Sequence, residues 1–437
     1  MADLWTGLSA DAQDALIWLA LLAPGLVLGA VICRGLALRA LLYSLLRRYP
    51  WTNLGYVALV ALSVGLGVGL IAQERGLRQA TARVAAKFDL ILAAPGDEIA
   101  MLMATVYLQP TDAPLLDGAT WDQVSRAAGS TALTAPIAYG DSWQGHPLVG
   151  STAGFVTHLA GNLAEGRIFA ANWQAVVGAR VPLAVGAHLS PAHGEGPAAE
   201  HDAHEGVEFE ITGRMAPTGS PWDDAIITPI ESVWLTHGLG NGHSDAETDR
   251  IGPPFDPAYF PGTPAILIAT PDLAQAYGLQ AQFATERSMA FFPGAVLARL
   301  HGLMGNLREV MSVLSLGTQI LVAASVMAGL IVLSRLFARR LALLQALGAP
   351  ARMIFALVWA YAALLLGLGA ALGLGVGLIA VRSLSSVLSA RSGLLIEPHL
   401  GWSELHLVAA YFTLALLVAL VPAALALTRP VTQELRR

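Results

Sequence analysis

Histidine side chains gather in one stretch of this chain: six of its eleven histidines lie between positions 188 and 243. The candidate metal ligands in that stretch are His193, His201, His204 and Glu205. Neutral imidazole and carboxylate groups are good ligands for zinc and related divalent ions, and His-rich tracts often bind metal. The pattern leaves two interpretations open, and one of them is weak, exchangeable zinc capture. The alternative is a solvated acidic loop without a ligand, because the spacing matches no closed structural zinc site.

A serine beside two aspartates, Ser220 with Asp223 and Asp224, could instead suggest hydrolase chemistry. The sequence contains no Gly-x-Ser-x-Gly elbow and no His-Glu-x-x-His motif. A turn formed by Pro217, Gly219 and Pro221 explains the same residues. The sequence also lacks the Gly-x4-Gly-Lys-[Ser/Thr] phosphate loop, so we expect neither catalytic residues nor a cofactor in this chain, with ATP bound by a separate protein.

A basic turn joins two apolar runs near the C-terminus, 311–333 and 354–381. The turn has no acidic residue and contains four arginines: Arg335, Arg339, Arg340 and Arg352. Its leucines recur at helical spacing, which predicts a short basic helix between two membrane helices. The residues expected to contact a soluble partner there are Arg339, Arg340, Leu344, Leu347, Gly348 and Arg352.

Composition favours a membrane protein. Of the 437 residues, 55% are hydrophobic and 13% are charged, against about 25% charged in a soluble domain. Five runs are apolar enough to be membrane spans: 15–33, 53–73, 311–333, 354–381 and 405–428. The net charge is −6, and the sequence has no stripe of basic and aromatic residues. No nucleic-acid partner is therefore expected.

The three short flanks that must share one side of the membrane are all basic, which assigns that side to the cytoplasm. The acidic N-terminus and the long middle segment then lie outside. Acidic residues before the first run argue for an uncleaved span rather than a secretory signal. The expected order begins with an N-terminal span in 1–34, an amphipathic interfacial helix in 35–52 and a span at 53–73. Stalk helices with an extracytoplasmic α/β domain follow in 74–310, and then a span at 311–333 and a cytoplasmic helix in 334–353. The chain continues with a span at 354–381, an outer loop in 382–404, and a span with a tail in 405–437.

Two heptad-like seams flank the middle segment. Leu70, Leu77 and Val84 are spaced by seven, and the apolar positions from Val296 to Leu314 step by four and three. They predict a two-helix stalk; the alternative is two amphipathic helices packed separately. Short strands are expected at 88–93, 176–178, 207–213, 225–229 and 265–269, and helices near 97–107, 121–128 and 271–277.

Glycines recur every four residues in two spans, at Gly65 and Gly69 and at Gly369, Gly373 and Gly377. Such stripes allow two helix backbones to approach closely. Ionisable residues are absent near the middle of the spans, which argues against an ion relay through the bilayer.

With the turn Arg339-Arg-Leu-Ala-Leu-Leu-Gln-Ala-Leu-Gly-Ala-Pro-Ala-Arg352, this order of elements resembles the FtsX-like/MacB-like permeases (LolC-type, type VII) of ABC systems. The similarity runs from Leu36 onward, and the extra N-terminal span departs from it. The turn keeps the family core Leu-x-Ala-Leu-Gly-Ala but has Gln345 where the family often has arginine, and it lacks the usual acidic residue. The segment from Ala216 to Asp223 looks like a narrower branch associated with metal homeostasis.

The resemblance implies an α-helical protein of the bacterial inner membrane with a large periplasmic α+β domain, MacB-like, on a two-helix stalk. It implies a permease subunit without enzyme activity of its own, whose partners are a separate ABC ATPase, a second copy or a homologous permease, the lipid bilayer and a periplasmic substrate-binding protein. The substrate, for export, extraction or transport, stays unidentified. The alternatives are a non-transporting subunit that transmits force, a tether or regulator, and a metal-responsive receptor.

Overall fold

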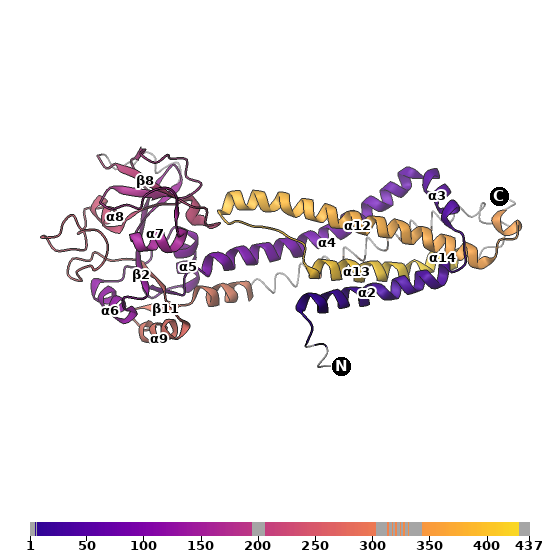
Figure 1. Cartoon of the computed structure of the whole chain (residues 1–437), viewed down its shortest axis with the longest axis horizontal. Coiled ribbons are helices and arrows are strands. Elements are labelled where there is room, and N and C mark those ends of the chain that lie inside the picture. The colour runs from indigo at the N-terminus through magenta and orange to yellow at the C-terminus, as the bar shows by residue number, and fades with distance from the viewer. Residues whose placement is uncertain are drawn as a thin grey trace. The chain divides into compact units, whose positions relative to one another are not determined.

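The chain divides into two compact units in this structure, a computed structural model (Figure 1). It describes residue 5, residues 7–194, 206–302 and 343–427, and six isolated positions between 313 and 331. We call residues 1–77, 306–387 and 397–437 the helical unit, and residues 78–305 and 388–396 the sheet unit.

Four helices of the described residues are long and apolar enough to cross a membrane. They are α2 (Ala10–Cys33), α4 (Pro50–Ala85), α12 (Ala351–Ser392) and the pair α13 (Trp402–Val418) and α14 (Leu420–Leu427), which continue one another. Four of the five expected spans are thus confirmed as helices of spanning length. The remaining run, 311–333, lies largely outside the described residues.

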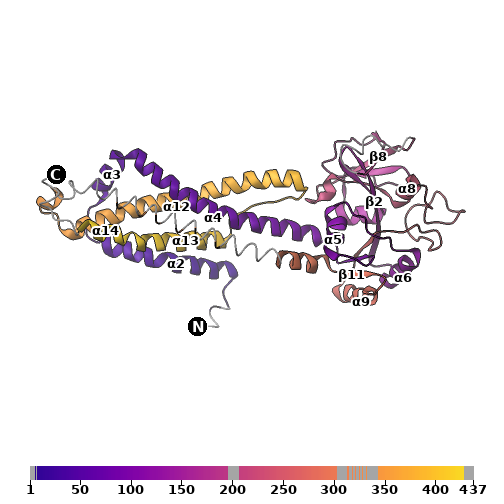
Figure 2. The same ribbon diagram turned by 180° about the vertical axis from the view of Figure 1, so that it is seen from behind.

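Within the helical unit, α4 and α12 lie side by side (Figures 1 and 2) with glycines at their contact. A Cβ atom placed on Gly373 would lie 2.7 Å from the Cβ of Val64 and 2.9 Å from the carbonyl oxygen of Ala61. One on Gly377 would lie 2.9 Å from the carbonyl oxygen of Gly65. These distances leave no room for a methyl group, so the close approach that the glycine spacing predicts is confirmed inside one chain.

The amphipathic segment before α4 forms the helix α3 (Arg39–Arg48). Its leucines pack against a cluster around Ile354, Leu357 and Tyr361 of α12. Pro50 is the first residue of α4. Proline is tolerated at this position because the first N–H groups of a helix have no intrahelical acceptor.

A mixed sheet forms the centre of the sheet unit, in the order β11-β1-β10-β2-β3-β9-β5-β8-β4, with β6 on β8 and β7 on β2. The pairs β3–β9 and β5–β8 are parallel and the others are antiparallel. The strands are β1 (Leu90–Ala93), β2 (Leu133–Trp143), β3 (His146–Ser151), β4 (Leu163–Gly166), β5 (Gln174–Val177), β6 (His188–Leu189), β7 (Ala192–His193), β8 (Phe209–Met215), β9 (Ile226–Pro229), β10 (Ala265–Ala269) and β11 (Met289–Phe291).

Both faces of this sheet are covered by helices. In β1, Ile91 and Ala93 enter one buried cluster while Leu90 and Leu92 enter the other, the alternation expected of a strand between two layers. The first cluster includes side chains of α5 (Glu98–Tyr107) and α7 (Ala153–Ala160). The second includes side chains of α6 (Gly118–Ala128), α8 (Ile230–Thr236) and α9 (Leu273–Phe283).

The combination of apolar helices with an α+β domain is confirmed, and so are the five expected strands (β1, β5, β8, β9 and β10) and three helices (α5, α6 and α9). Residues 382–392, which the sequence assigns to a loop, continue α12 to Ser392. The first seam of the expected stalk lies in α4, which is continuous through Leu77 and Val84. The second seam begins in a helix at residues 293–302. Val84 and Val296 share one buried cluster; the rest of the second seam, 303–314, lies almost entirely outside the described residues.

Candidate functional site

Three side chains of ligand type converge near the end of β2 in the sheet unit. Asp141 in β2 and His193 in β7 are direct partners in the antiparallel ladder between the two strands. His237 follows α8 and caps it, with its backbone N–H donating to carbonyl oxygens of the last turn. One ligand atom from each residue lies within 4.8 Å of the others, so this cluster could hold a metal ion.

The carboxylate of Asp141 lies between the two imidazoles. Its Oδ1 atom is 3.4 Å from Nδ1 of His193, and its Oδ2 atom is 3.3 Å from Nε2 of His237. The side chain of Asp141 is 1% exposed, while that of His193 is 58% exposed and reaches solvent. A buried carboxylate needs a compensating partner. The hydrogen bond that Asp141 accepts from His237 accordingly raises the pKa of His237, because the protonated imidazole is favoured beside the carboxylate.

Backbone contacts hold β7 against β2 at this position. The N–H of Gly194 donates to the carbonyl oxygen of Gly140 at 2.7 Å, and the Ser142 hydroxyl donates to the carbonyl oxygen of Gly194 at 2.6 Å. Gly140 has φ +141°, a backbone conformation that favours glycine. The cluster is therefore positioned by a strand pair and a helix end.

Of the four metal ligands expected from the sequence, the structure brings only His193 into this cluster; His201, His204 and Glu205 lie outside the described residues. Asp141 and His237 were not predicted as ligands. His237 was visible as one of the clustered histidines, but no local signal marks Asp141, since strand pairing alone brings it to His193.

The basic turn is described from residue 343 onward, so Arg339 and Arg340 lie outside the described part. Residues 343–346 are helical, and the helix ends in a Schellman motif: the N–H of Ala349 donates to Leu344 and that of Gly348 to Gln345, each at 2.9 Å. Gly348 takes the left-handed conformation this motif requires, with φ +96°. Leu344 packs against the α3–α12 cluster, whereas Leu347 is 84% exposed.

Arg352, in the first turn of α12, contacts the C-terminal end of α2. Its Nη2 atom donates to the carbonyl oxygens of Val31 at 3.3 Å and Arg34 at 2.9 Å. The last carbonyls of a helix have no intrahelical donor, and a cation there is favourable. Arg352 therefore fixes the turn to α2, in addition to the partner contact expected of it.

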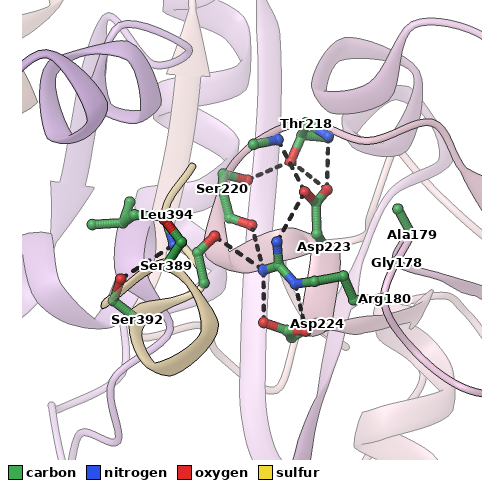
Figure 3. A network of polar contacts seen from close by, with 12 residues as sticks. Gly178, Ala179, Arg180, Thr218, Ser220, Asp223, Asp224, Ser389, Ser392 and Leu394 are labelled. Atoms are coloured by element: carbon green, nitrogen blue, oxygen red, sulfur yellow. Dashed lines mark hydrogen bonds and ion pairs between the residues drawn. The ribbon is translucent and has the colours of Figure 1, made fainter. Parts of the chain in front are cut away.

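A second polar network of the sheet unit surrounds Arg180, after β5 (Figure 3). Its guanidinium binds the Asp224 carboxylate with two hydrogen bonds, 2.9 Å from Nε and 2.7 Å from Nη2. Nη2 also donates to the carbonyl oxygens of Gly393, at 3.0 Å, and Ser220, at 3.2 Å. Gly393 directly follows α12, and the N–H of Leu395 donates to the Gly219 carbonyl oxygen at 3.1 Å. These contacts hold the segment after α12 within the sheet unit.

Asp223, considered above for hydrolase chemistry, closes the neighbouring turn. Its carboxylate accepts hydrogen bonds from the backbone N–H groups of Thr218, at 2.7 Å, and Gly219, at 2.9 Å. The Ser220 hydroxyl lies 2.5 Å from that of Thr218. These contacts form the turn that the proline and glycine spacing predicts.

Comparison with protein-family models finds no match for this chain, and comparison with curated proteins finds none either.

Proposed function

We propose that this chain is the membrane subunit of an ABC-type complex, a permease-like protein that couples ATP hydrolysis by a separate ATPase to conformational change outside the membrane. In this proposal it lies in a bacterial inner membrane with the sheet unit in the periplasm, and it pairs with a second copy or a homologous permease. It moves, extracts or exports a substrate that other subunits help to deliver.

The observation that carries the proposal is the continuity of α12. This helix begins at Ala351, directly after the Gly348 turn, and remains unbroken for 42 residues to Ser392. At about 1.5 Å per residue it is on the order of 60 Å long. The residues that follow it are held by Arg180 and Gly219 in the sheet unit. A continuous helix that joins the turn to residues held in the sheet unit suits the transmission of force.

The turn has the features of a docking site for a soluble partner. Leu347 is 84% exposed directly before the glycine that ends the short helix, while the hydrogen bonds of Arg352 hold the turn to α2. An exposed leucine next to basic residues offers a partner an apolar anchor with a charged rim.

Isolation of the tagged full-length protein from its own membranes tests the proposal. We expect an ATPase to co-purify with the wild type, and to be lost from Leu347→Asp and from a combined Arg339→Glu, Arg340→Glu and Arg352→Glu variant. Leu347→Asp is the cleaner change, because Arg352 also holds the turn. Leu273→Asp, at a 65% exposed leucine of α9, is the matched control and should retain the ATPase. Wild-type amounts of ATPase on the Leu347→Asp and arginine variants would reject the coupling role.

The alternative is a metal-responsive regulator that moves no substrate, and the cluster of Asp141, His193 and His237 is the observation that favours it. Zinc at the His-rich loop belongs to this alternative. If zinc changes the ATPase rate of the complex while no substrate accumulates across vesicle membranes, the regulatory function is favoured over transport.

A further inference from the structure

We propose that Asp141, His193 and His237 form a binding site for one divalent transition-metal ion, with Zn²⁺ as the ion whose chemistry fits best. This site shares only His193 with the metal ligands that the sequence predicts. Its other two ligands are Asp141 in β2 and His237 at the end of α8. It does not rest on the proposed partnership with an ATPase.

Ligand spacing is the first argument. Ligand atoms around a tetrahedral zinc ion with bonds of 2.0–2.1 Å lie about 3.3 Å apart. His193 Nδ1 lies 3.4 Å from Asp141 Oδ1, His237 Nε2 lies 3.3 Å from Asp141 Oδ2, and one ligand atom from each of the three residues lies within 4.8 Å of the others. The separations are near the tetrahedral value, and a small rotation of the carboxylate would direct one oxygen toward an ion between the two imidazoles. The two imidazole rings are close neighbours, with centroids 5.4 Å apart and planes inclined at 72°.

The donor set is the second argument. Two imidazoles and one carboxylate suit zinc and neighbouring transition metals, while Mg²⁺ and Ca²⁺ prefer oxygen ligands alone. Three protein ligands leave a fourth tetrahedral position for water or another donor. Because the His193 side chain is 58% exposed, an ion can enter from solvent and leave again. The site is therefore suited to reversible capture rather than to a closed structural role.

Rigidity is the third argument. The Gly194–Gly140 and Ser142–Gly194 hydrogen bonds fix the strand pair on which Asp141 and His193 lie. The backbone of His237 is fixed by its place as the cap of α8, a helix whose Ile230, Val233 and Trp234 are buried. Preorganised ligands lose little conformational entropy when they bind an ion.

Zinc titration of the full-length, detergent-solubilised protein after removal of metal by a chelator tests the site. We expect one zinc ion per chain to bind reversibly at this cluster, a rise in the unfolding temperature on zinc addition, and visible bands of tetrahedral geometry when Co²⁺ replaces zinc. His193→Ala, His237→Ala and Asp141→Asn should each weaken binding by about tenfold or more. His193 is exposed, so its variant should fold even where the buried Asp141→Asn variant fails.

Two controls separate this cluster from other histidines. His188→Ala, at a 61% exposed histidine of β6, the strand that precedes β7 in the sequence and pairs with β8, should leave the affinity unchanged. The combined His201→Ala and His204→Ala variant should also retain the site. Wild-type affinity in both His193→Ala and His237→Ala, or loss of binding only in the 201/204 variant, would overturn the inference. ATPase co-purification from the same samples reports separately on the proposed function.

Discussion

The guanidinium group of Arg180 donates a hydrogen bond of 3.0 Å to the carbonyl oxygen of Gly393, the first residue after α12. The same side chain binds Asp224 through two hydrogen bonds, so Arg180 links the residue after α12 to the turn at Pro221–Asp224. The guanidinium group satisfies a carbonyl oxygen at the helix end and a carboxylate together, and it thereby holds residues 388–396 within the sheet unit.

Replacing Arg180 by methionine should loosen the segment 388–396. The side chain is 40% exposed, so we expect a loss of only about 1 kcal/mol, equivalent to about fivefold faster amide hydrogen exchange. Exchange should increase at Leu394, Leu395 and Ile396. Arg126→Met, at a 78% exposed arginine of α6, is the control. Unchanged exchange at the three amides in Arg180→Met would show that other contacts hold the segment.

Adding one methyl group to α12 should distinguish two glycines that are two residues apart. A Cβ on Gly373 would meet Val64 at 2.7 Å, whereas one on Gly375 has no atom of the described residues within 4 Å. Gly373→Ala should push α4 away and lower the stability by about 1–2 kcal/mol, despite the better helix propensity of alanine. Gly375→Ala should be neutral or stabilising. Thermal unfolding in detergent gives the comparison, and equal melting temperatures would contradict the packing.

Local patterns sufficed to predict part of the fold. The glycine stripes and the strands β1, β8 and β10 appear in the sequence because spacing and apolar runs depend on neighbouring residues alone. The strand β2 was missed, since its Pro136, Gly140 and Asp141 are typical of turns and it becomes a strand through its partners β10 and β3. Hydropathy also could not predict that α12 extends to Ser392, because its last turns are polar.

The sequence indicated metal chemistry for the candidate site, but it did not predict which three residues form the site. The histidine-rich stretch indicated metal binding and included both His193 and His237. Proximity in sequence, however, favoured His201, His204 and Glu205 over Asp141, a carboxylate that reaches His193 only through pairing of β2 with β7. In the turn, the sequence predicts one helix over 334–353, whereas the short helix ends at Gly348 and α12 begins at Ala351. That Arg352 binds α2 depends on tertiary packing and has no local signal.

Glu231 should make the sheet unit less stable as the pH rises. Its side chain is 1% exposed at the start of α8, where Oε1 accepts a hydrogen bond from the Gly252 N–H and lies 3.4 Å from Nε2 of His243. Burial raises the pKa of this carboxyl from 4.5 to about 7. Because the folded-state pKa lies above the unfolded one, the folded protein keeps the proton longer. The stabilisation is complete below about pH 4.5 and is lost as the pH rises through about 7.

Glu231→Gln removes this ionisation and keeps an acceptor for Gly252. Relative to the wild type, the variant should therefore gain about 3 kcal/mol of stability between pH 5 and pH 8. Burial lowers the pKa of His243, so protonation of this histidine reduces the stability as the pH falls. Both the wild type and Glu231→Gln contain His243. Thermal unfolding followed by tryptophan fluorescence at several pH values measures the difference. Glu247→Gln, at a 49% exposed side chain, is the control. Parallel pH profiles for wild type and Glu231→Gln would show that Glu231 does not titrate in this range.

Loss of Arg75 should destabilise the helical unit because it leaves a buried carboxylate unpaired. Arg75 of α4 forms an ion pair with Glu404 of α13, whose side chain is fully buried and whose Oε2 atom accepts the Gly401 N–H at 2.9 Å. Arg75→Met alone should cost about 3 kcal/mol, while the double variant with Glu404→Gln should recover most of this, since glutamine is neutral and still caps α13. Thermal unfolding of both variants in detergent checks this, with Arg382→Met, at an exposed residue of α12, as control. Equal destabilisation of the single and double variants would mean that the ion pair is not the source of the effect, because only an unpaired charge is relieved by neutralising its partner.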